Sequence, residues 1–117
     1  MGWIMKRGEI YFANLNPTVG GETNKKIRPV LVVSNNVNNN VADTVTFAPI
    51  TSNTKKVFPF EVLLKTKHTR LKKTSKAQCH QIRTISKLRV SGNMAGVVNK
   101  ETMKKVEYAI KLHLDLF

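Results

Sequence analysis

The stretch 26–34, KIRPVLVVS, constrains the fold more than any other part of the sequence. Residues 29–33 run without a polar break, which is typical of a strand that is covered on both faces. Arg28 stands directly before Pro29, and a residue in that position is pushed from helical into extended geometry. We therefore expect a permanently charged guanidinium at the mouth of a buried strand, where its rigid fork of donors suits phosphate oxygens. The alternative is an arginine that only reaches from the rim into solvent.

The charge of the chain indicates a polyanionic partner. Twenty lysines and arginines against seven acidic residues give a net charge of +13 in 117 residues, and nucleic acid is the usual partner of so basic a chain. An anionic membrane is the competing partner, but no stretch approaches the ~20 apolar residues that a membrane-spanning helix needs. Residues 1–9 hold too few large apolar side chains for a signal peptide. We expect a single domain, 1–117, in the cytoplasm.

Cysteine and histidine usage argues against several classes of site. The lone Cys79 excludes an internal disulfide and fits a reducing cytosol. We expect it to be a packed small hydrophobe. One cysteine and three scattered histidines give no zinc-ligand spacing, and no glycine-rich phosphate loop follows a strand. Neither a metal nor a nucleotide cofactor is therefore expected.

Alternation and turn residues predict a mainly β domain. Strands are expected at 9–14, 29–33, 44–50, 57–64 and 75–83, with a brief helical turn at 84–89. Loops are expected at 19–26, at the asparagine-rich 35–40 and at the basic 65–76. Asn99 is expected to cap a terminal helix whose apolar stripe is Met103, Val106, Ala109, Ile110, His113, Leu114 and Phe117. These elements predict a small β-barrel with one helix packed on it.

Three polar segments beside the expected strands suit an RNA phosphate. The pliable loop 19–26 leads into Arg28 and could fold over a ligand, although it could also be a simple hairpin connection. Segment 51–56 combines hydroxyl, amide and lysine side chains, and its alternative role is turn formation. The basic run 65–76 is either a solvated loop or part of a field that steers RNA. On a strand at 75–83, Gln78 and His80 would share one face.

Several short motifs occur in the order seen in MazF/PemK toxins. They are KRGEIY at 6–11, NPTVG at 16–20, RPVLVV at 28–33, ITS at 50–52 and QIRTI at 81–85. The chain therefore resembles the mRNA interferases of type II toxin–antitoxin pairs over nearly everything from Lys6 to Leu116. Residues 1–4 precede the usual start of the family and are expected to be an N-terminal extension.

The resemblance implies an SH3-like small barrel of MazF/CcdB type with a C-terminal helix. It also implies a homodimer with single-stranded RNA across its groove and a cognate antitoxin whose acidic segment competes for that groove. The implied activity is that of a sequence-specific, metal-independent endoribonuclease acting on mRNA. In that reaction the 2′-hydroxyl of the substrate attacks the adjacent phosphorus, leaving a 2′,3′-cyclic phosphate and a 5′-hydroxyl.

The resemblance also assigns site residues. Arg28 matches the catalytic arginine of the family and suits charge stabilisation rather than proton removal. Thr51 matches the catalytic threonine, which we assign to orienting the phosphate or relaying a proton. Together with the polar segments above, the predicted RNA contacts are Gly20, Gly21, Glu22, Lys26, Ser52, Asn53, Lys55, Gln78 and Gln81.

His80 departs from the family, which usually has Asp or Glu at its position. One branch of the family uses that carboxylate as the base, with an arginine where this chain has Gln78 and a histidine where it has Gly21. The branch based on arginine and threonine is therefore the better template. A neutral imidazole at His80 could still take the 2′-hydroxyl proton. The alternative is a histidine that packs or hydrogen-bonds across the dimer.

Two rival functions remain open on the sequence alone. One is a non-enzymatic toxin on the same fold, of the kind that poisons gyrase through its terminal helix. The arginine-proline and QIRT motifs argue against this. The other is an RNA-binding barrel without chemistry, which the charge alone permits.

Overall fold

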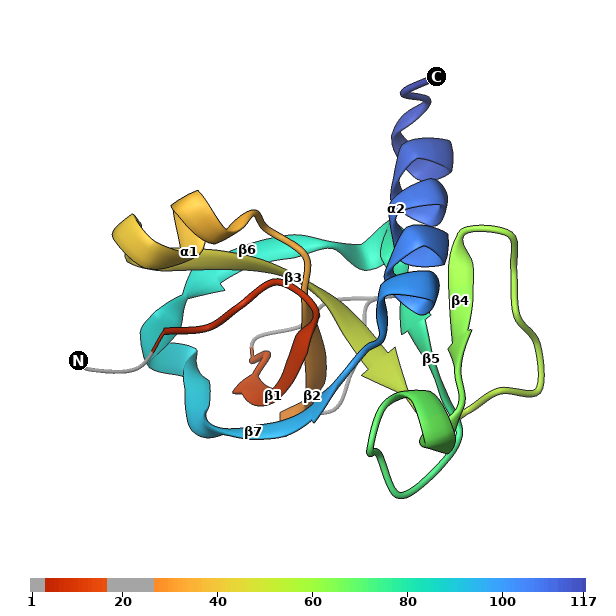
Figure 1. Ribbon diagram of the computed structural model, residues 1–117, viewed down its shortest axis with the longest axis horizontal. Coiled ribbons are helices and arrows are strands. Elements are labelled where there is room, and N and C mark those ends of the chain that lie inside the picture. Colours follow the sequence, from red (N-terminus) through yellow and green to blue (C-terminus); the bar gives the residue numbers. More distant parts are fainter. Residues whose placement is uncertain (1–3, 17–26) are drawn as a thin grey trace.

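The computed structural model describes residues 4–16 and 27–117, which form a curled antiparallel sheet and a C-terminal helix (Figure 1). The strands are β1 Glu9–Asn14, β2 Ile27–Val32, β3 Thr44–Thr51, β4 Glu61–Leu64, β5 Ser75–Gln78, β6 Arg83–Ser86 and β7 Val90–Val97. The helices are α1 Asn36–Val41 and α2 Lys100–Leu114, and short 3₁₀ turns occupy Thr66–His68, Cys79–Gln81 and Lys87–Arg89. The prediction of a mainly β fold that ends in a helix is confirmed.

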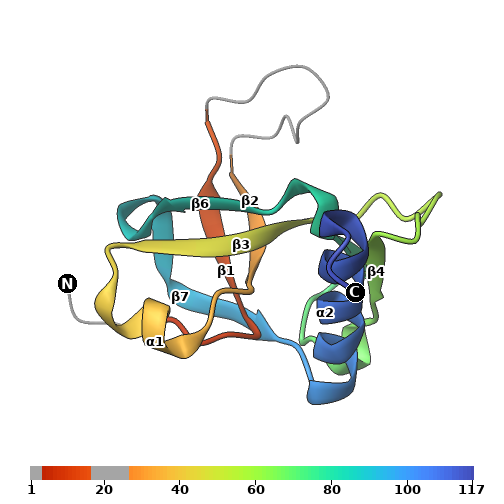
Figure 2. The same ribbon diagram turned by 90° about the horizontal axis from the view of Figure 1, so that it is seen from above.

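Strand β3 is the centre of the sheet. One edge of β3 pairs with β2, whereas the other edge pairs with β6 from Thr44 to Phe47 and with β5 at Ile50 and Thr51. The remaining ladders join β1 to β2, β1 to β7 and β4 to β5. Among the described residues no ladder joins β7 back to β4 or β6, so the sheet curls without closing into a complete barrel (Figure 2).

Strand β2 is buried on both faces, as its unbroken apolar run predicted. Val30 and Val32 pack with Phe47 in one core cluster. Leu31 points the other way, into a second cluster that includes Val106 of α2. Burial of an aliphatic side chain of this size contributes about 1.5–3 kcal/mol. The strand therefore packs into both cores at once, and its first residues are held firmly in place.

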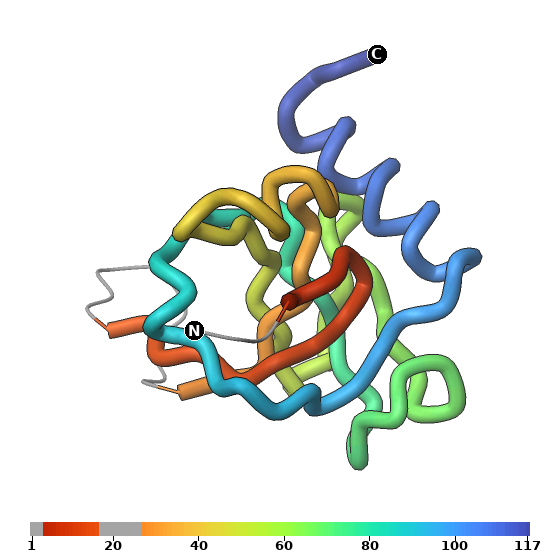
Figure 3. The backbone as a smooth tube through the Cα atoms, turned by 60° about the vertical axis from the view of Figure 1, so that its left-hand side comes forward, coloured from red at the N-terminus to blue at the C-terminus, as the bar shows by residue number. Residues whose placement is uncertain are grey.

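Helix α2 begins as predicted, because the Asn99 side chain accepts a hydrogen bond from the Thr102 amide at 2.9 Å. The predicted apolar stripe is buried in its first half, at Met103, Val106 and Ala109. Ile110 packs against the same core, but the prediction is wrong for the end of the stripe, where His113, Leu114 and Phe117 are exposed. The reason is that the helix runs past the sheet and away from it (Figure 3). No helix in ranges 4–16 and 27–117 is long and apolar enough to cross a membrane.

The asparagine-rich segment, predicted as a loop, is helix α1 instead. Asn35 caps it by accepting a hydrogen bond from the Asn38 amide at 2.8 Å. Asn39 is fully buried, and its side-chain amide donates to the Ser34 carbonyl at 2.9 Å. The side-chain hydrogen bonding that makes asparagine a turn former therefore caps and anchors a short helix here.

The strand predicted at 57–64 is limited to Glu61–Leu64. Phe58 and Glu61 close a turn ahead of it. The Phe58 amide donates to the Glu61 carboxylate at 3.0 Å, and the Glu61 amide donates to the Phe58 carbonyl at 2.9 Å. Proline at position 59 suits such a turn, whereas it cannot donate to a strand ladder.

The strand predicted at 75–83 is wrong as a continuous element. It breaks after Gln78 into the 3₁₀ turn Cys79–Gln81, and β6 follows. The break has a topological cause, because β5 and β6 occupy different parts of the same edge of β3. The predicted alternation that placed Gln78 and His80 on one strand face therefore does not hold.

The segment after position 82 is more extended than predicted. Of the helical turn expected at 84–89, only the 3₁₀ turn Lys87–Arg89 forms, since β6 continues to Ser86. Strand β7 was not predicted, because Gly92 and polar neighbours interrupt its alternation. Its pairing with β1 stabilises it as a strand, although its own sequence has no regular apolar alternation.

The buried Asn39 generates a stability prediction. Asn39→Ala leaves the Ser34 carbonyl and hydroxyl without their amide partner. We expect a loss of about 1–3 kcal/mol in the free energy of unfolding, the usual cost of an unsatisfied buried polar group. Urea unfolding measures it, with the exposed neighbour variant Asn40→Ala as the matched control. Equal unfolding midpoints in the two variants would contradict the anchoring role of Asn39.

Candidate functional site

A pocket of about 460 Å³ lies beside the start of β2 and the end of β3. Arg28, Thr51 and Ser52 line it. Val30 pairs with Pro49 in the antiparallel β2–β3 ladder. Arg28 precedes Val30 by two residues and Thr51 follows Pro49 by two residues, so both lie at the same end of the ladder. The structure thus brings two of the three candidate catalytic residues, and one predicted RNA contact, into one pocket, whose lining does not include His80.

The rest of the pocket lining is mostly apolar or basic. The apolar lining consists of Phe12, Ile27, Pro29, Ile50, Leu71 and Ala95. The basic lining consists of Arg70, Lys72 and Lys73. An apolar surface beside cations suits a nucleotide, which carries a flat base and a charged phosphate.

Arg28 is only 8% exposed although it carries a charge. Its Nη1 donates to the Ile50 carbonyl at 3.1 Å. Its Nε is buried and has no hydrogen-bond partner among the described residues. Burial lowers the pKa of the guanidinium from its usual value, yet an arginine in a protein stays protonated. An anion that enters the pocket would supply the partner that the buried donor lacks.

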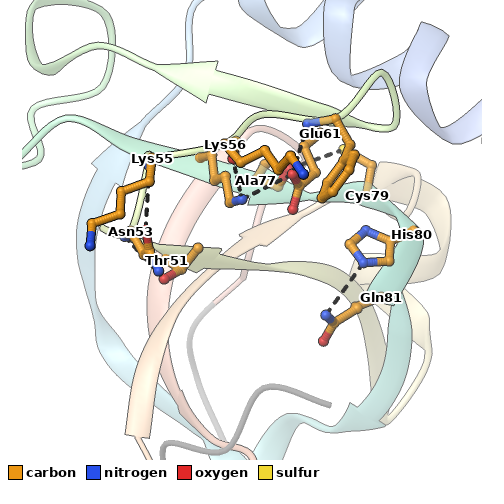
Figure 4. Close-up of polar contacts among 11 residues, drawn as sticks. Thr51, Asn53, Lys55, Lys56, Glu61, Ala77, Cys79, His80 and Gln81 are labelled. Atoms are coloured by element: carbon orange, nitrogen blue, oxygen red, sulfur yellow. Dashed lines mark hydrogen bonds and ion pairs between the residues drawn. The ribbon is translucent and has the colours of Figure 1, made fainter. Parts of the chain in front are cut away.

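Thr51 closes β3 and opens the turn that follows it. Its hydroxyl accepts a hydrogen bond from the Asn53 amide at 3.2 Å, and the Asn53 side chain accepts one from the Lys55 amide at 3.3 Å (Figure 4). Both side chains therefore do form a turn, which was the alternative to phosphate binding for this segment. The Thr51 hydroxyl retains its own proton for donation, and the residue lines the pocket.

A buried ion pair lies next to this turn and is hydrogen-bonded to the residue at its end, Lys56. Lys76, which pairs with Thr51 across the β3–β5 ladder, places its ammonium 3.0 Å from the Glu61 carboxylate. The same ammonium donates to the Lys56 carbonyl at 2.6 Å. Lys76 therefore belongs to the interior and not to the exposed basic run. Removal of one partner of such a pair typically costs 3–5 kcal/mol.

His80 lies outside the pocket. Its ring packs 4.4 Å from the ring of Phe60 and 6.3 Å from that of His113, as centroid distances. Its Nε2 is 3.5 Å from the Gln81 amide nitrogen. Figure 4 shows His80 and Gln81 on the far side of Glu61 from Thr51. Strand β5 pairs with β3 only up to Ala77, opposite Ile50, and the segment that carries His80 and Gln81 follows after this last pair.

The protonation state of His80 follows from its surroundings. Burial is the main cause that lowers the pKa of its imidazole, and the charges of His113 and Lys76 lower it further, against an opposing effect of Glu61. Its Nδ1 is buried and has no hydrogen-bond partner within the described residues. The ring is therefore neutral at neutral pH.

Cys79 is fully buried, as predicted for a packed small hydrophobe. Burial, with a smaller contribution from Glu61, raises the pKa of its thiol to about 12. The thiol is therefore uncharged and unreactive at neutral pH. Ranges 4–16 and 27–117 hold no group of three or more side chains suited to bind a metal.

Comparison with known proteins gives the relationship of this chain. Residues 6–114 match the family described as PemK-like, MazF-like toxin of type II toxin-antitoxin system. The chain belongs to this family. Endoribonuclease MazF9 of Mycobacterium tuberculosis is 41% identical over 119 residues, which cover 97% of this chain and 99% of that protein. Endoribonuclease EndoA of Bacillus subtilis is 37% identical over 114 residues, with 97% of each covered.

Solved structures confirm the fold of this PemK/MazF-like chain. MazF from Deinococcus radiodurans has a TM-score of 0.83 at 22% identity and covers 98% of this chain and 100% of its own. An endoribonuclease from a mycobacterial species, solved in complex with its cognate antitoxin, has a TM-score of 0.75 at 24% identity. It covers 97% of this chain and 96% of its own.

The predicted RNA contacts of this PemK/MazF-like chain fall into three groups. Ser52 lines the pocket, and Asn53 and Lys55 shape the turn beside it. Gln78 and Gln81 lie at the end of β5 and in the following 3₁₀ turn, away from the pocket lining. Gly20, Gly21, Glu22 and Lys26 lie outside the described residues.

Sequence reasoning missed two features of the pocket. Phe12, on the strand predicted at 9–14, was not singled out from the sequence, but it is 45% exposed and lines the pocket. Arg70, Lys72 and Lys73 were noted only as part of a basic run. The density of charge in that run was the available signal, but nothing in the run itself indicated which pocket it borders.

Proposed function

We propose that this chain is an endoribonuclease and the toxin of a type II toxin–antitoxin system, acting on single-stranded mRNA in the cytoplasm. The relatives named above support the activity. The observation that carries the proposal is the buried Arg28, whose Nε is unpaired among the described residues in a pocket that also contains the Thr51 hydroxyl. A phosphate is the anion that such a pocket fits best.

The proposed reaction is a transesterification that is independent of metal ions. The 2′-oxygen forms a bond to the adjacent phosphorus as the bond from phosphorus to the 5′-oxygen breaks. A base removes the 2′-hydroxyl proton, and an acid returns a proton to the leaving oxygen. The products are a 2′,3′-cyclic phosphate and a 5′-hydroxyl.

Arg28 stabilises the negative charge that gathers on the phosphorane. Its guanidinium cannot act as a base because it stays protonated. Its fixed position beside the Ile50 carbonyl means that little reorganisation accompanies the reaction. Thr51 orients the phosphate or relays a proton through its hydroxyl.

The proposed partners follow from charge and exposed apolar surface. A net charge of +13 suits both RNA and an acidic antitoxin segment. One relative was solved with its cognate antitoxin, which supports such an inhibitor here. The exposed end of α2, with Tyr108, Leu112 and Leu114, supports a homodimer, because apolar surface of this kind is usually covered.

Arg28→Ala tests the role of the guanidinium. We expect the cleavage rate of single-stranded RNA in EDTA to fall by about two to three orders of magnitude, as is usual when one charge-stabilising donor is lost. Arg28→Lys keeps the charge without the fork and is expected to recover only part of the rate.

The controls for this measurement separate the rival functions. Thr51→Val removes the hydroxyl and keeps the shape, so unchanged cleavage in this variant would reduce Thr51 to a turn former. Full activity in Arg28→Ala would overturn the assignment of Arg28. Binding without cleavage by the parent would leave an RNA-binding module, and neither binding nor cleavage would favour the gyrase-poison alternative.

His80→Asn tests whether His80 is the base. A neutral base loses activity as the pH falls through its pKa, and for His80 that pKa lies below 6.5. Because His80 lies outside the pocket, we expect parent and variant to show the same pH–rate profile. Loss of an acidic limb below pH 6.5 in the variant alone, with a rate drop on the order of 100-fold or more, would establish His80 as the base.

A further inference from the structure

The pocket that contains Arg28 has a second set of cations whose position is built into the fold. Arg70, Lys72 and Lys73 line the pocket, and we refer to these three residues as the basic arm. They come from the segment between β4 and β5, which is remote in sequence from both Arg28 and Thr51. Exposed lysines on a surface loop usually have no fixed position, so the packing of this segment decides whether the arm can act as a site.

Thr69 fixes the start of the basic arm. It is 1% exposed although it lies in a loop. Its hydroxyl donates to the Lys65 carbonyl at 3.1 Å and accepts from the Leu71 amide at 3.2 Å. Its carbonyl accepts from the Val97 amide of β7 at 3.1 Å. One buried residue thus joins the loop to itself and to the sheet.

Gly96 allows this loop to approach the sheet. A Cβ atom at position 96 would lie 2.3 Å from the Thr69 carbonyl oxygen, a distance that real Cβ atoms do not reach. The β1–β7 ladder also has an irregularity here, since Ile10 pairs with Gly96 and Tyr11 pairs with Met94. The extra residue between them, Ala95, lines the pocket. The same short stretch of β7 therefore accepts the loop and shapes the pocket.

The backbone turns at Arg70, the residue that follows Thr69. Arg70 has φ 63°, in the left-handed region that non-glycine residues rarely adopt. Its amide donates to the Thr66 carbonyl at 3.1 Å. The next residue, Leu71, packs against the core and lines the pocket. Strain of this kind persists only when its surroundings hold it, and it often marks functional segments.

We propose that the basic arm is a second phosphate-binding site, which holds the RNA backbone at a phosphate next to the one bound by Arg28. This inference rests on the proposed function. The pocket that Arg28 and the arm share also has an apolar lining, which includes Phe12 and Leu71 and suits the base of a nucleotide. The arm binds the substrate and takes no part in bond breaking. Thr69 acts as its positioning residue.

The test compares two double variants of equal charge. Lys72→Gln/Lys73→Gln removes two cations of the arm, and Lys104→Gln/Lys105→Gln removes two exposed cations of α2 that do not line this pocket. The probe is a single-stranded RNA that the parent cleaves, with a 2′-deoxy nucleotide at the mapped cleavage position so that binding is measured without reaction. Its Kd is measured over a range of salt concentrations, and KM and kcat are measured with the unmodified RNA.

Loss of the one phosphate contact assigned to the arm should reduce the slope of log Kd against log salt by ~0.7, the value for one contact with a single strand. We therefore expect this reduction, a raised KM and an unchanged kcat in the arm variant, and a nearly parental slope in the α2 variant. Equal slopes in the two double variants would overturn the proposal. A parent that neither binds nor cleaves the RNA would instead contradict the proposed function itself.

Thr69 variants test the positioning of the arm. Thr69→Val removes both hydroxyl hydrogen bonds and keeps the shape, so KM should rise as in the arm variant while all the lysines remain. Thr69→Ser retains the hydroxyl and should restore the parental KM. If KM stays parental in a folded Thr69→Val, as judged by its urea midpoint, the positioning role is wrong. Gly96→Ala serves only as a further check, because its clash could prevent folding.

Discussion

The burial of Arg28 at the start of β2 is the constraint on which the rest of the site depends. A charge taken out of water is costly unless the protein or a ligand supplies hydrogen bonds to it. Within the described residues the guanidinium donates one hydrogen bond, to the Ile50 carbonyl. The strand that carries Arg28 cannot shift to relieve this, because Val30 and Leu31 are fixed in separate cores. The Nε of Arg28 therefore has no partner among the described residues, and under the proposed function the substrate phosphate supplies one.

A second part of the pocket is built by elements on the other edge of β3. β5 pairs with β3 at Thr51, and the buried Lys76–Glu61 ion pair fixes the turn that follows this residue. The segment ahead of β5 brings the basic arm to the same place, through Thr69 and the close approach at Gly96. The net charge of the chain explains attraction to RNA in general, whereas these contacts explain why the cations gather around one pocket.

Most of the fold could be predicted from local pattern, because strands β1 and β3 and helix α2 carry clear signals of their own. An unbroken apolar run was enough to identify β2 as buried, and the Asn99 cap was enough to begin α2. The 3₁₀ turn at Cys79–Gln81 could not be predicted from local sequence. It connects β5 and β6, which pair with different parts of the same edge of β3, and that pairing depends on residues distant in sequence. Helix α1 was missed because its stability depends on the burial of Asn39 against Ser34. For the site, the resemblance pointed to Arg28 and Thr51, but the place of the basic arm depends on long-range contacts that no local pattern contains.

In the reaction proposed above, Arg28 and Thr51 support attack by the 2′-hydroxyl of the substrate on its own phosphate. The most direct measurement uses two RNAs that differ only by a 2′-deoxy nucleotide at the mapped cleavage position, both incubated with the parent protein in EDTA. Mass spectrometry then identifies the ends of the fragments. We expect a 2′,3′-cyclic phosphate and a 5′-hydroxyl from the unmodified RNA and no cleavage at the modified position. Cleavage of the deoxy-substituted RNA at that position, or fragments with 5′-phosphate ends, would contradict it.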